Sequence, residues 1–375
     1  MPAVSYRILV DGEPLSPEIL AAVSTLEVED HAHLADMLRL RLSVAVKEDW
    51  SGWTVLDDDP FPRLARVTVT ASVGPRTRET LIDAYVIEVT ARLSEKPGLS
   101  TLDVVAMDPS VLLHLDEKVR GWPDMSDGDI ARQVFADHGF EADVDATEPT
   151  REAVASETVQ RGTDMQLLRF LAERNGFEVY VETDPRTGSP VGHFHAPRLD
   201  RTPQGVLSVA HGASTNVDEF AATFDMLRPA VVAAAGLAAS DHSEHSASAD
   251  EVAVSTLGKD SLLPRDRPRR TLLSATGAFE APELQAAAQA EVDRSAWALS
   301  AEGRLSTAAY GAILRAKRTV AVRGAGRRFS GTWYVERVLH RLAGASYTQE
   351  FTLRRNGIGV TGEEDFRPDG DGGTP

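Results

Sequence analysis

A strict alternation of apolar and polar side chains runs through the first hundred residues and restricts this part of the chain to half-buried strands. In residues 37–46, Leu38, Leu40 and Leu42 share one face, and the arginines between them share the other. A period of two residues is typical of a strand with one face in a core. Similar short runs between glycines and prolines predict further strands, and together they favour a sandwich or a small barrel. These runs are residues 67–73, 81–90 and 101–107.

Length and composition narrow the architecture. The chain has 375 residues, and a single hydrophobic core stops growing at roughly 250–300 residues, so we expect two or more domains. With 42% hydrophobic and 26% charged residues, the chain has the composition of an ordinary globular protein. It contains no cysteine, which excludes disulfides, thiolate zinc sites, iron–sulfur clusters and thiol nucleophiles.

Charge and hydropathy also limit the partners. A formal net charge of −18 argues against a nonspecific binder of nucleic acid or of anionic membranes. The most apolar stretch, residues 230–239, is too short for the ~20 residues of a membrane-spanning helix. Asp11 and Glu13 interrupt any signal-peptide core. We therefore expect no nucleic-acid partner and no membrane span, and synthesis in the bacterial cytoplasm.

Two helices are marked in the middle of the chain. Ser126 is a candidate N-cap and Gly139 a stop for the first. Thr163 and Gln166 form a capping box for the second, which ends at a left-handed Gly176. Strands follow in residues 177–182 and in GHFHAP, so the sequence predicts a small α/β unit.

The C-terminal third combines a predicted long loop, a helix, further strands and an acidic tail. Residues 238–272 are small, polar and basic and predict a long loop that includes the basic stretch 264–270. Residues 281–300 predict an Ala-rich helix, and further strands follow, among them 347–354. Residues 361–375 predict a disordered acidic tail.

A search for chemistry yields weak candidates. His193 and His195 are two residues apart on a strand and could face one ion, but no third residue has suitable spacing, so we favour surface histidines and expect no metal. The pairs His31 with His33 and His242 with His245 are weaker. Residues 57–59 are three aspartates in a Pro-bounded loop, which is typical of solvated charge rather than of a glycosidase pair. No nucleophile elbow, Walker loop or strand-bound GxGxxG is present in the sequence. We expect no cofactor and no catalytic residue.

Two ordered segments resemble a known family. VQRGTDMQLLRFLAERNGFEVYVE (159–182) and GAGRRFSGTWYVERVLHRLAGASYTQEFTLRRNG (324–357) resemble motifs of the late-control gene D family of contractile-phage tail hubs and of the N-terminal hub part of VgrG spike proteins. The usual Pro-Gly before the second motif is replaced by AILRAKRTVAVRG. The matching residues are Gln160, Asp164, Phe170, Leu171, Ala172, Gly176, Tyr180, Phe329, Gly331, Tyr334, Val335, His340, Tyr347 and Thr348.

The resemblance implies an α+β, mainly β fold. Two related small β-barrels, residues 1–108 and 216–360, would flank an inserted α/β domain at 109–215. It also implies a structural baseplate hub without enzymatic activity. Three chains would close into a ring of six barrels that adapts a sixfold tube to a threefold spike.

The resemblance further implies the partners: a homotrimer, the inner tube protein, a spike protein and other baseplate proteins. VgrG proteins continue into a needle, whereas this chain ends soon after its last predicted strand, so we expect the spike to be a separate protein. We expect subunit contacts through strands 37–46, 81–90 and 347–354. The basic stretch 264–270 is equally well explained as a contact to an acidic neighbour and as an ordinary solvated loop.

Two other functions stay open at this point. A peptidoglycan-degrading tail enzyme would need a catalytic carboxylate or a His/Asp set in a cleft. A carbohydrate-binding module would need exposed aromatics on one sheet, and Trp50 and Trp53 are better explained as turn anchors. The sequence does not decide between a phage tail and a phage-derived injection system.

Overall fold

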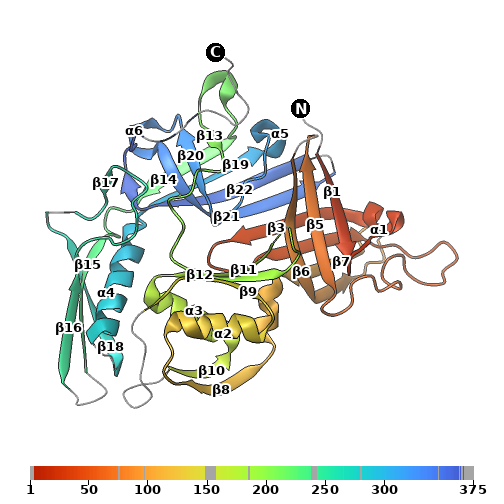
Figure 1. Cartoon of the computed structure of the whole chain (residues 1–375). Helices are drawn as coiled ribbons and strands as arrows, with labels where there is room; N and C mark the ends of the chain where they lie inside the picture. The colour runs from red at the N-terminus through yellow and green to blue at the C-terminus, as the bar shows by residue number, and fades with distance from the viewer. Residues whose placement is uncertain are drawn as a thin grey trace.

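One large, mainly antiparallel sheet runs through the molecule, with an α/β unit beneath it and a smaller lobe at one end (Figure 1). The computed structural model describes residues 4–74, 77–96, 98–147, 158–184, 186–237, 243–264, 266–278, 281–344, 346–362, 364 and 366.

The N-terminal half of the sheet follows the alternating pattern of the sequence. Leu38, Leu40 and Leu42 are buried, and the interleaved Arg41 pairs with Asp103 on the outer face, with Nε 2.6 Å from Oδ1. The elements are β1 (Val4–Val10), β2 (Glu13–Pro14), α1 (Pro17–Ala22), β3 (Val23–His31), β4 (Met37–Ser43), β5 (Arg66–Val73), β6 (Thr77–Arg92) and β7 (Thr101–Met107).

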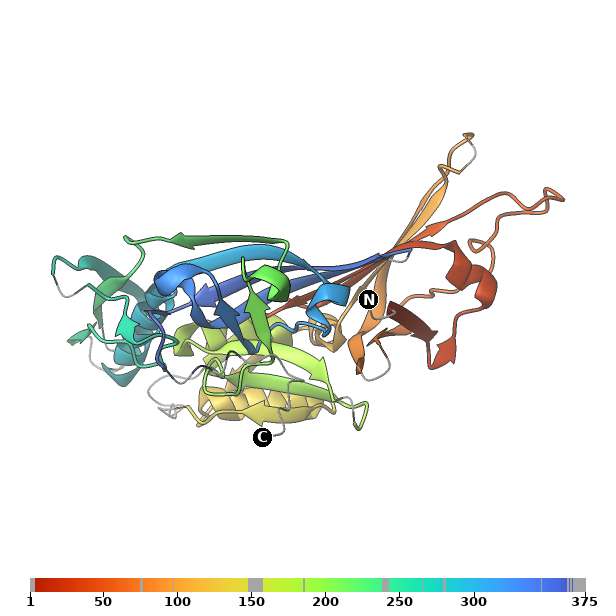
Figure 2. The same cartoon turned by 90° about the horizontal axis from the view of Figure 1, so that it is seen from above.

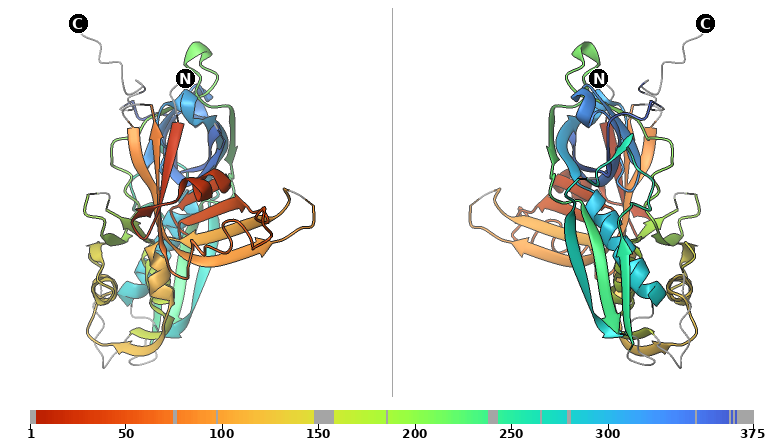
Figure 3. Two further views of the ribbon diagram at one scale, coloured as in Figure 1. Left: turned by 90° about the vertical axis from the view of Figure 1, so that its right-hand side faces the viewer. Right: turned by 90° about the vertical axis from the view of Figure 1, so that its left-hand side faces the viewer.

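The C-terminal half has its own core around the buried Trp333, Phe351 and Leu353. Viewed end on, its strands curl round a common axis (Figure 3). Its elements are β13 (Val206–Ser208), η2 (Gly212–Ser214), β14 (Glu219–Phe224), β17 (Asp260–Ser261), β19 (Leu299–Ser306), α5 (Thr307–Tyr310), β20 (Thr319–Arg323), α6 (Gly326–Phe329), β21 (Gly331–Ala343), β22 (Ser346–Arg355) and β23 (Gly357–Ile358).

The two halves are joined strand to strand. β21 pairs with β20 through its first residues and with β3 through its last, from Arg337 opposite His31 to Leu342 opposite Leu26. The strand order is therefore continuous, β14-β19-β22-β21-β3-β4-β7-β6-β5-β1-β2. Leu342 packs into the core of the N-terminal half, so the junction is apolar as well as hydrogen-bonded.

The inserted unit lies beneath this sheet (Figure 1). Its core gathers around Trp122, Phe135 and Leu168. β9 runs parallel to β12, so the hairpin β11–β12 gains a third strand. The elements are η1 (Pro109–His114), β8 (Glu117–Trp122), α2 (Asp127–Asp137), β9 (Glu141–Val144), β10 (Thr158–Thr163), α3 (Asp164–Asn175), β11 (Glu178–Thr183) and β12 (Pro190–His195).

Strands interrupt the long loop predicted at 238–272, at Glu244–Ala249, at Asp260–Ser261 and from Arg269 onward. Val232, Ala234 and Ala249 are buried against Leu284, Ala288 and Val292 of a helix, which gives these short side chains a core of their own. The signal was missed because alanine and serine carry little apolar periodicity by themselves. The helix predicted at 281–300 ends at Ala296, where the strand β19 soon follows. The elements of this lobe are β15 (Ala230–Leu237), β16 (Glu244–Ala249), β18 (Arg269–Ala278) and α4 (Ala281–Ala296).

The expected fold class is confirmed: the chain is mainly β, with large antiparallel sheets and helices in the inserted unit and the lobe. The strand expected at 37–46 ends at Ser43, and Val46 forms only an isolated bridge with Trp53. Most of the expected tail 361–375 lies outside the described residues.

The strands expected to carry subunit contacts lie inside the sheet. β4 is paired with β3 and β7, and β22 with β19 and β21, so their edges are already used. The end of β6 differs, because it extends with β7 into a hairpin that projects from the body (Figure 2). Ile87 and Val89 on this hairpin are 44% and 45% exposed.

Candidate functional site

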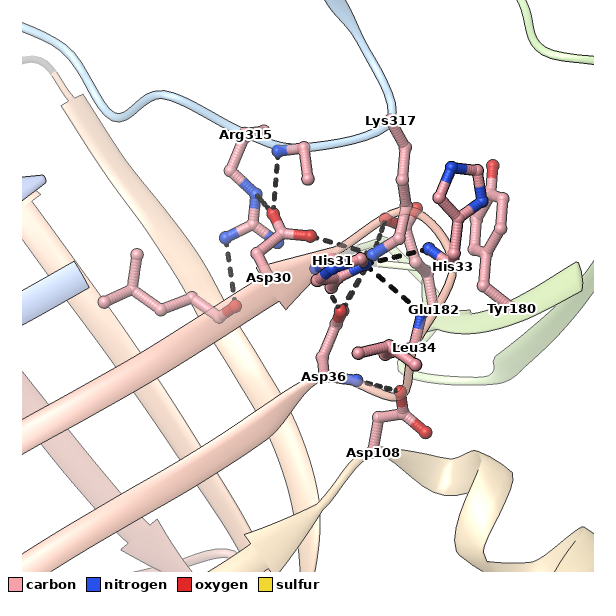
Figure 4. Close-up of polar contacts among 12 residues, drawn as sticks. Asp30, His31, His33, Leu34, Asp36, Asp108, Tyr180, Glu182, Arg315 and Lys317 are labelled. Atoms are coloured by element: carbon pink, nitrogen blue, oxygen red, sulfur yellow. Dashed lines mark hydrogen bonds and ion pairs between the residues drawn. The ribbon is translucent and has the colours of Figure 1, made fainter. Parts of the chain in front are cut away.

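A buried cluster of charges lies where the two halves of the sheet meet the inserted unit (Figure 4). The ammonium of Lys317 is 2.8 Å from Asp30 Oδ1, 2.9 Å from Asp36 Oδ2 and 3.4 Å from Glu182 Oε1. Asp30 lies next to the last residue of β3, Asp36 precedes β4, Glu182 lies on β11, and Lys317 precedes β20. A single cation therefore holds three parts of the chain that are far apart in sequence.

Arg315 extends this cluster toward β6. Its Nε lies 3.2 Å from Asp30 Oδ2, and its Nη1 donates to the carbonyl oxygen of Leu81 at 2.9 Å. The amide of Gln204 exchanges two hydrogen bonds of 2.8 Å with the backbone of Arg315. The backbone N–H of Ala316 donates to Asp30 Oδ2 at 3.1 Å. The segment that carries Arg315 and Lys317 is thus fixed by both backbone and side-chain bonds.

The turn between β3 and β4 presents the second aspartate. The N–H of Asp36 donates to Asp108 Oδ2 at 2.6 Å, and the N–H of Asp108 donates to the carbonyl of Asp36 at 3.0 Å. The N–H of His31 donates to Asp36 Oδ1 at 2.8 Å. These bonds place the Asp36 carboxylate under the ammonium of Lys317.

Burial and the neighbouring charges act in opposite directions here. Burial would lower the pKa of Lys317, but Asp30, Asp36 and Glu182 outweigh it and raise that pKa well above its usual value. Burial would raise the pKa of Asp30, but Lys317 and Arg315 hold it below its usual range. The pKa of Asp36 is raised by burial and by the nearby Asp30 carboxylate. Lys317 therefore stays cationic, with its charge compensated inside the protein.

The backbone of Lys317 is itself unusual. Its φ of 63° lies in the left-handed region, which residues with a Cβ seldom occupy. The N–H of Lys317 donates to the carbonyl of Val335 at 2.9 Å and holds this conformation. Val335 is one of the motif residues, and its buried side chain belongs to the C-terminal core.

Four aromatic or histidine residues of the two motifs surround this junction. The ring of Tyr180 lies 5.1 Å from the ammonium of Lys317. The hydroxyl of Tyr347 is 2.9 Å from His340 Nδ1, and His340 is fully buried. Burial lowers the pKa of His340 to about 3, so the ring is neutral at neutral pH. The fourth is Tyr334, which contacts the inserted unit.

Tyr334 binds a buried glutamate across the junction. Its hydroxyl lies 2.7 and 2.8 Å from the two carboxylate oxygens of Glu178 on β11. Burial raises the pKa of Glu178 to about 7, although the hydrogen bond from Tyr334 opposes the shift. Both residues line a pocket of about 470 Å³, together with Trp297 and Glu336.

The first motif builds a separate polar cluster inside the inserted unit. Gln160 Nε2 donates to Asp164 Oδ1 at 2.8 Å, and Trp122 Nε1 donates to Gln160 Oε1 at 3.3 Å. Lys118 Nζ lies 2.5 Å from Asp164 Oδ2, and His138 Nε2 lies 2.7 Å from the same oxygen. These contacts fix β8, β10 and the start of α3 to one another.

The rest of the first motif shapes α3. The capping box of Thr163 and Gln166 is present, and Gly176 closes the helix in the left-handed conformation with φ 67°. Leu171 and Ala172 are buried in the inserted core, whereas Phe170 is 56% exposed. The motif is therefore mainly a folding signal, and Phe170 is its exposed exception.

The remaining motif residues lie in the C-terminal half. The carbonyl of Phe329 accepts the indole N–H of Trp333 at 2.8 Å. Gly331 has φ 130° and lies against the guanidinium of Arg355, where a Cβ would clash. Thr348 lies on β22, opposite residues of both β19 and β21.

The other candidates from the sequence have ordinary local roles. Asp57 accepts a 2.6 Å hydrogen bond from the N–H of Trp53 in its turn. His31 Nδ1 accepts the N–H of His33 at 3.0 Å. His242 lies outside the described residues. His193 and His195 differ, because the parallel pairing of β9 with β12 places Asp143 beside them.

Sequence reasoning missed the charged residues at the junction. Arg315 and Lys317 stand in the stretch AILRAKRTVAVRG, where the sequence departs from the expected Pro-Gly. Lysine is scarce in this chain, and a lysine shortly before a predicted strand was the available signal. Their partner Asp30 is more than 280 residues away, with no spacing rule to connect them.

Comparison with known proteins places the chain in a family. A family model described as the Alg8 N-terminal domain matches residues 1–344. The chain belongs to the Alg8 N-terminal domain family. No curated protein matches it. Membership of the late-control gene D family stays a prediction.

Solved structures share the fold of this Alg8 N-terminal domain family member. The 43 kDa tail protein of prophage MuSo2 from Shewanella oneidensis has a TM-score of 0.65 at 16% identity, covering 94% of this chain and 99% of that one. The Escherichia coli c3393 protein, a component of the type VI secretion system, has a TM-score of 0.57 at 13% identity, covering 93% and 76%. The Francisella PdpA-VgrG complex contains a chain with a TM-score of 0.57 at 8% identity, covering 95% and 53%. The fold is thus that of phage tail proteins and of VgrG-related secretion proteins.

Among the described residues, none of the helices has the length and apolarity that a bilayer crossing requires.

Replacing Lys317 with methionine tests the charge cluster. Lys317→Met keeps the stem but leaves Asp30 and Asp36 buried without their cation, so the free energy of unfolding should fall by about 3–5 kcal/mol. Arg39→Met removes one of the two arginine partners of Glu29 near the surface and should cost about 1 kcal/mol or less. Chemical denaturation measures both. A cost for Lys317→Met no larger than that of the control contradicts the cluster's role, and Asp36→Asn in the same chain should restore part of the loss.

Glu178 predicts a pH-dependent stability. Its pKa rises from 4.5 to about 7 on folding, so the folded state binds the proton more tightly. The resulting stabilisation is complete below the unfolded pKa and is lost as the pH rises through about 7. As the pH rises between these limits, the free energy of unfolding of the wild-type chain should fall by up to about 3 kcal/mol relative to that of Glu178→Gln. Denaturation at a series of pH values measures this difference. Glu302→Gln, at an exposed position on β19, is the control, and parallel curves for wild type and Glu178→Gln contradict the assignment.

Proposed function

We propose that this chain is a structural baseplate hub of a contractile phage tail or of a phage-derived contractile injection system. Three copies form a ring that adapts a sixfold inner tube to a threefold spike protein. The partners are further copies of this chain, the tube protein, a spike protein and other baseplate proteins. The fold shared with tail proteins and VgrG-related chains supports this proposal.

The observation that carries the proposal is the arrangement of the two β halves. In each half, the strand at the junction forms a hairpin with the next strand outward, β3 with β4 on one side and β21 with β22 on the other. The two hairpins meet antiparallel through β3 and β21. One chain therefore carries two comparable β units, and three chains in a closed ring present six of them.

The projecting β6–β7 hairpin supports a contact between copies. Ile87, Val89, Leu93 and Leu99 are exposed on it, by 44% to 60%. A cluster of exposed apolar side chains on an extended hairpin is typical of a surface that is covered in an assembly. We therefore propose that this hairpin contacts the neighbouring copy in the ring.

The mass of the purified chain tests the ring. The wild-type chain should have the mass of three copies in light scattering. Val89→Asp should shift the mass toward one copy, because it buries a charge in the subunit contact. Thr90→Asp, the next residue on the same strand, is the control and should leave three copies. A monomeric wild-type chain at every concentration, or a Val89→Asp chain that stays trimeric, counts against this contact.

Purification from the producing cell tests the hub itself. Sheath, tube and spike proteins should co-purify with a tagged chain and be identified by mass spectrometry. Negative-stain electron microscopy of the same sample should show rod-shaped particles. Recovery of the tagged chain alone, without any tail protein, would contradict the proposal.

A cell-wall-degrading enzyme is the alternative, and one observation favours it. Glu178, with its pKa raised to about 7, and Glu336 both line the 470 Å³ pocket, and a carboxyl with a raised pKa can serve as a general acid. Both oxygens of Glu178 are already bound by Tyr334, which supports a structural role. We expect no clearing of a cell-wall suspension by the purified chain. Clearing that is abolished in Glu178→Gln and kept in Glu302→Gln would establish the enzyme instead.

A further inference from the structure

We propose that Asp143, His193 and His195 form a binding site for a divalent first-row transition ion of the Zn²⁺ type. One ligand atom of each residue lies within 4.8 Å of the others. The site lies on β9 and β12, which are an edge strand and the central strand of the three-stranded sheet in the inserted unit.

The topology of the inserted unit assembles the three side chains. β9 runs parallel to β12, and the register places Asp143 directly opposite His193. His193 and His195 are two residues apart on β12, so their side chains lie on the same face. The carboxylate and the two imidazoles therefore converge from two adjacent strands.

The spacing of the ligand atoms suits a tetrahedral ion. With metal–ligand bonds of roughly 2.0–2.1 Å, neighbouring ligand atoms of a tetrahedron are about 3.3 Å apart. Asp143 Oδ2 lies 3.1 Å from His193 Nδ1 and 3.8 Å from His195 Nε2. Small movements of the half-exposed Asp143 side chain would close the site around an ion.

Outer contacts orient the ligands as they do in known metal sites. His195 Nδ1 lies 2.7 Å from the carbonyl oxygen of Ala196 and must donate to it, because a carbonyl only accepts. Its Nε2 therefore carries the lone pair that a metal needs. Arg198 lies 3.6 Å from Asp143 Oδ1 and 2.8 Å from Asp145 Oδ1, so it fixes the carboxylate from the other side.

Tyr180 completes the surroundings of the site. Its ring stacks on that of His193 with centroids 4.4 Å apart, and its hydroxyl lies 3.1 Å from His195 Nε2. A bound ion would replace this hydrogen bond, and water or the tyrosine oxygen would fill the fourth position. The side chain of His195 is 1% exposed and that of Asp143 is 41% exposed, so the ion would enter from the aspartate side.

The donor set decides the class of ion. Two imidazoles and one carboxylate suit Zn²⁺, Co²⁺, Ni²⁺ or Fe²⁺, whereas Ca²⁺ and Mg²⁺ prefer oxygen ligands. Three protein ligands leave an open position, and the bound ion would tie β9 to the β11–β12 hairpin. Because Tyr180 also faces Lys317, the ion would brace the inserted unit against the junction.

Metal titration of the full chain tests the site. After removal of metal with a chelator, calorimetry with Zn²⁺ should show one ion per chain, and Co²⁺ should give the visible absorption of a tetrahedral site. His193→Asn and Asp143→Asn should each weaken binding at least tenfold and lose the Co²⁺ spectrum. His211→Asn, an exposed histidine outside the cluster, is the control and should bind like the wild type.

Thermal unfolding without metal separates ligation from folding. His193→Asn and Asp143→Asn should unfold near the wild-type temperature in chelator, and only wild type and His211→Asn should gain stability on adding Zn²⁺. No binding by the wild-type chain overturns the proposal. Zn²⁺ binding by Asp143→Asn that is as tight as that of the wild type also overturns it. Because the Asp143 side chain is half-exposed, this variant should fold, so the test holds even if His193→Asn does not fold.

Discussion

The ammonium of Lys317 is the interaction on which the arrangement of this molecule depends. It holds Asp30 from the N-terminal half, Glu182 from the inserted unit and the turn at Asp36, while its own backbone is bonded to β21. A buried ion cluster is costly to desolvate and contributes little net stability compared with an apolar replacement. Its value is geometric, because the charges are satisfied in only one arrangement of the three parts. We regard the cluster as a device that fixes the relative orientation of the three parts, as the proposed hub would require.

The sheet and the cluster support one another. The β3–β21 ladder joins the two halves through backbone hydrogen bonds, and such a ladder alone could twist over a range of angles. Arg315 contacts Asp30 on β3 and the carbonyl of Leu81 on β6, and these fixed contacts beside the ladder restrict that twist. Tyr334 with Glu178 adds a second fixed point to the inserted unit. The motif residues at this junction therefore help to set how the inserted unit is oriented relative to the two halves of the sheet.

The sequence predicted the motif helix and its surroundings accurately and missed the charges between units. Thr163, Gln166 and Gly176 act within a dozen residues of one another, so capping rules reach them directly. Asp30 and Lys317 are 287 residues apart in the sequence, and no local rule connects them. The same limit applies to His193 and Asp143. Their strands are parallel, a pairing that needs a long connection and leaves no spacing signature in the sequence.

What the sequence determined by itself is local and periodic. The alternation at Leu38, Leu40 and Leu42 required a half-buried strand, because a period of two can bury only one face of a strand. The absence of cysteine excludes disulfides and thiolate sites, and the net charge of −18 argues against nonspecific binding of nucleic acid. The tertiary structure alone decided that residues 238–272 contribute strands, that the two halves share one sheet, and that Lys317 is buried among carboxylates. Each of these depends on contacts between segments distant in sequence, where burial and charge compensation act only once the chain has folded.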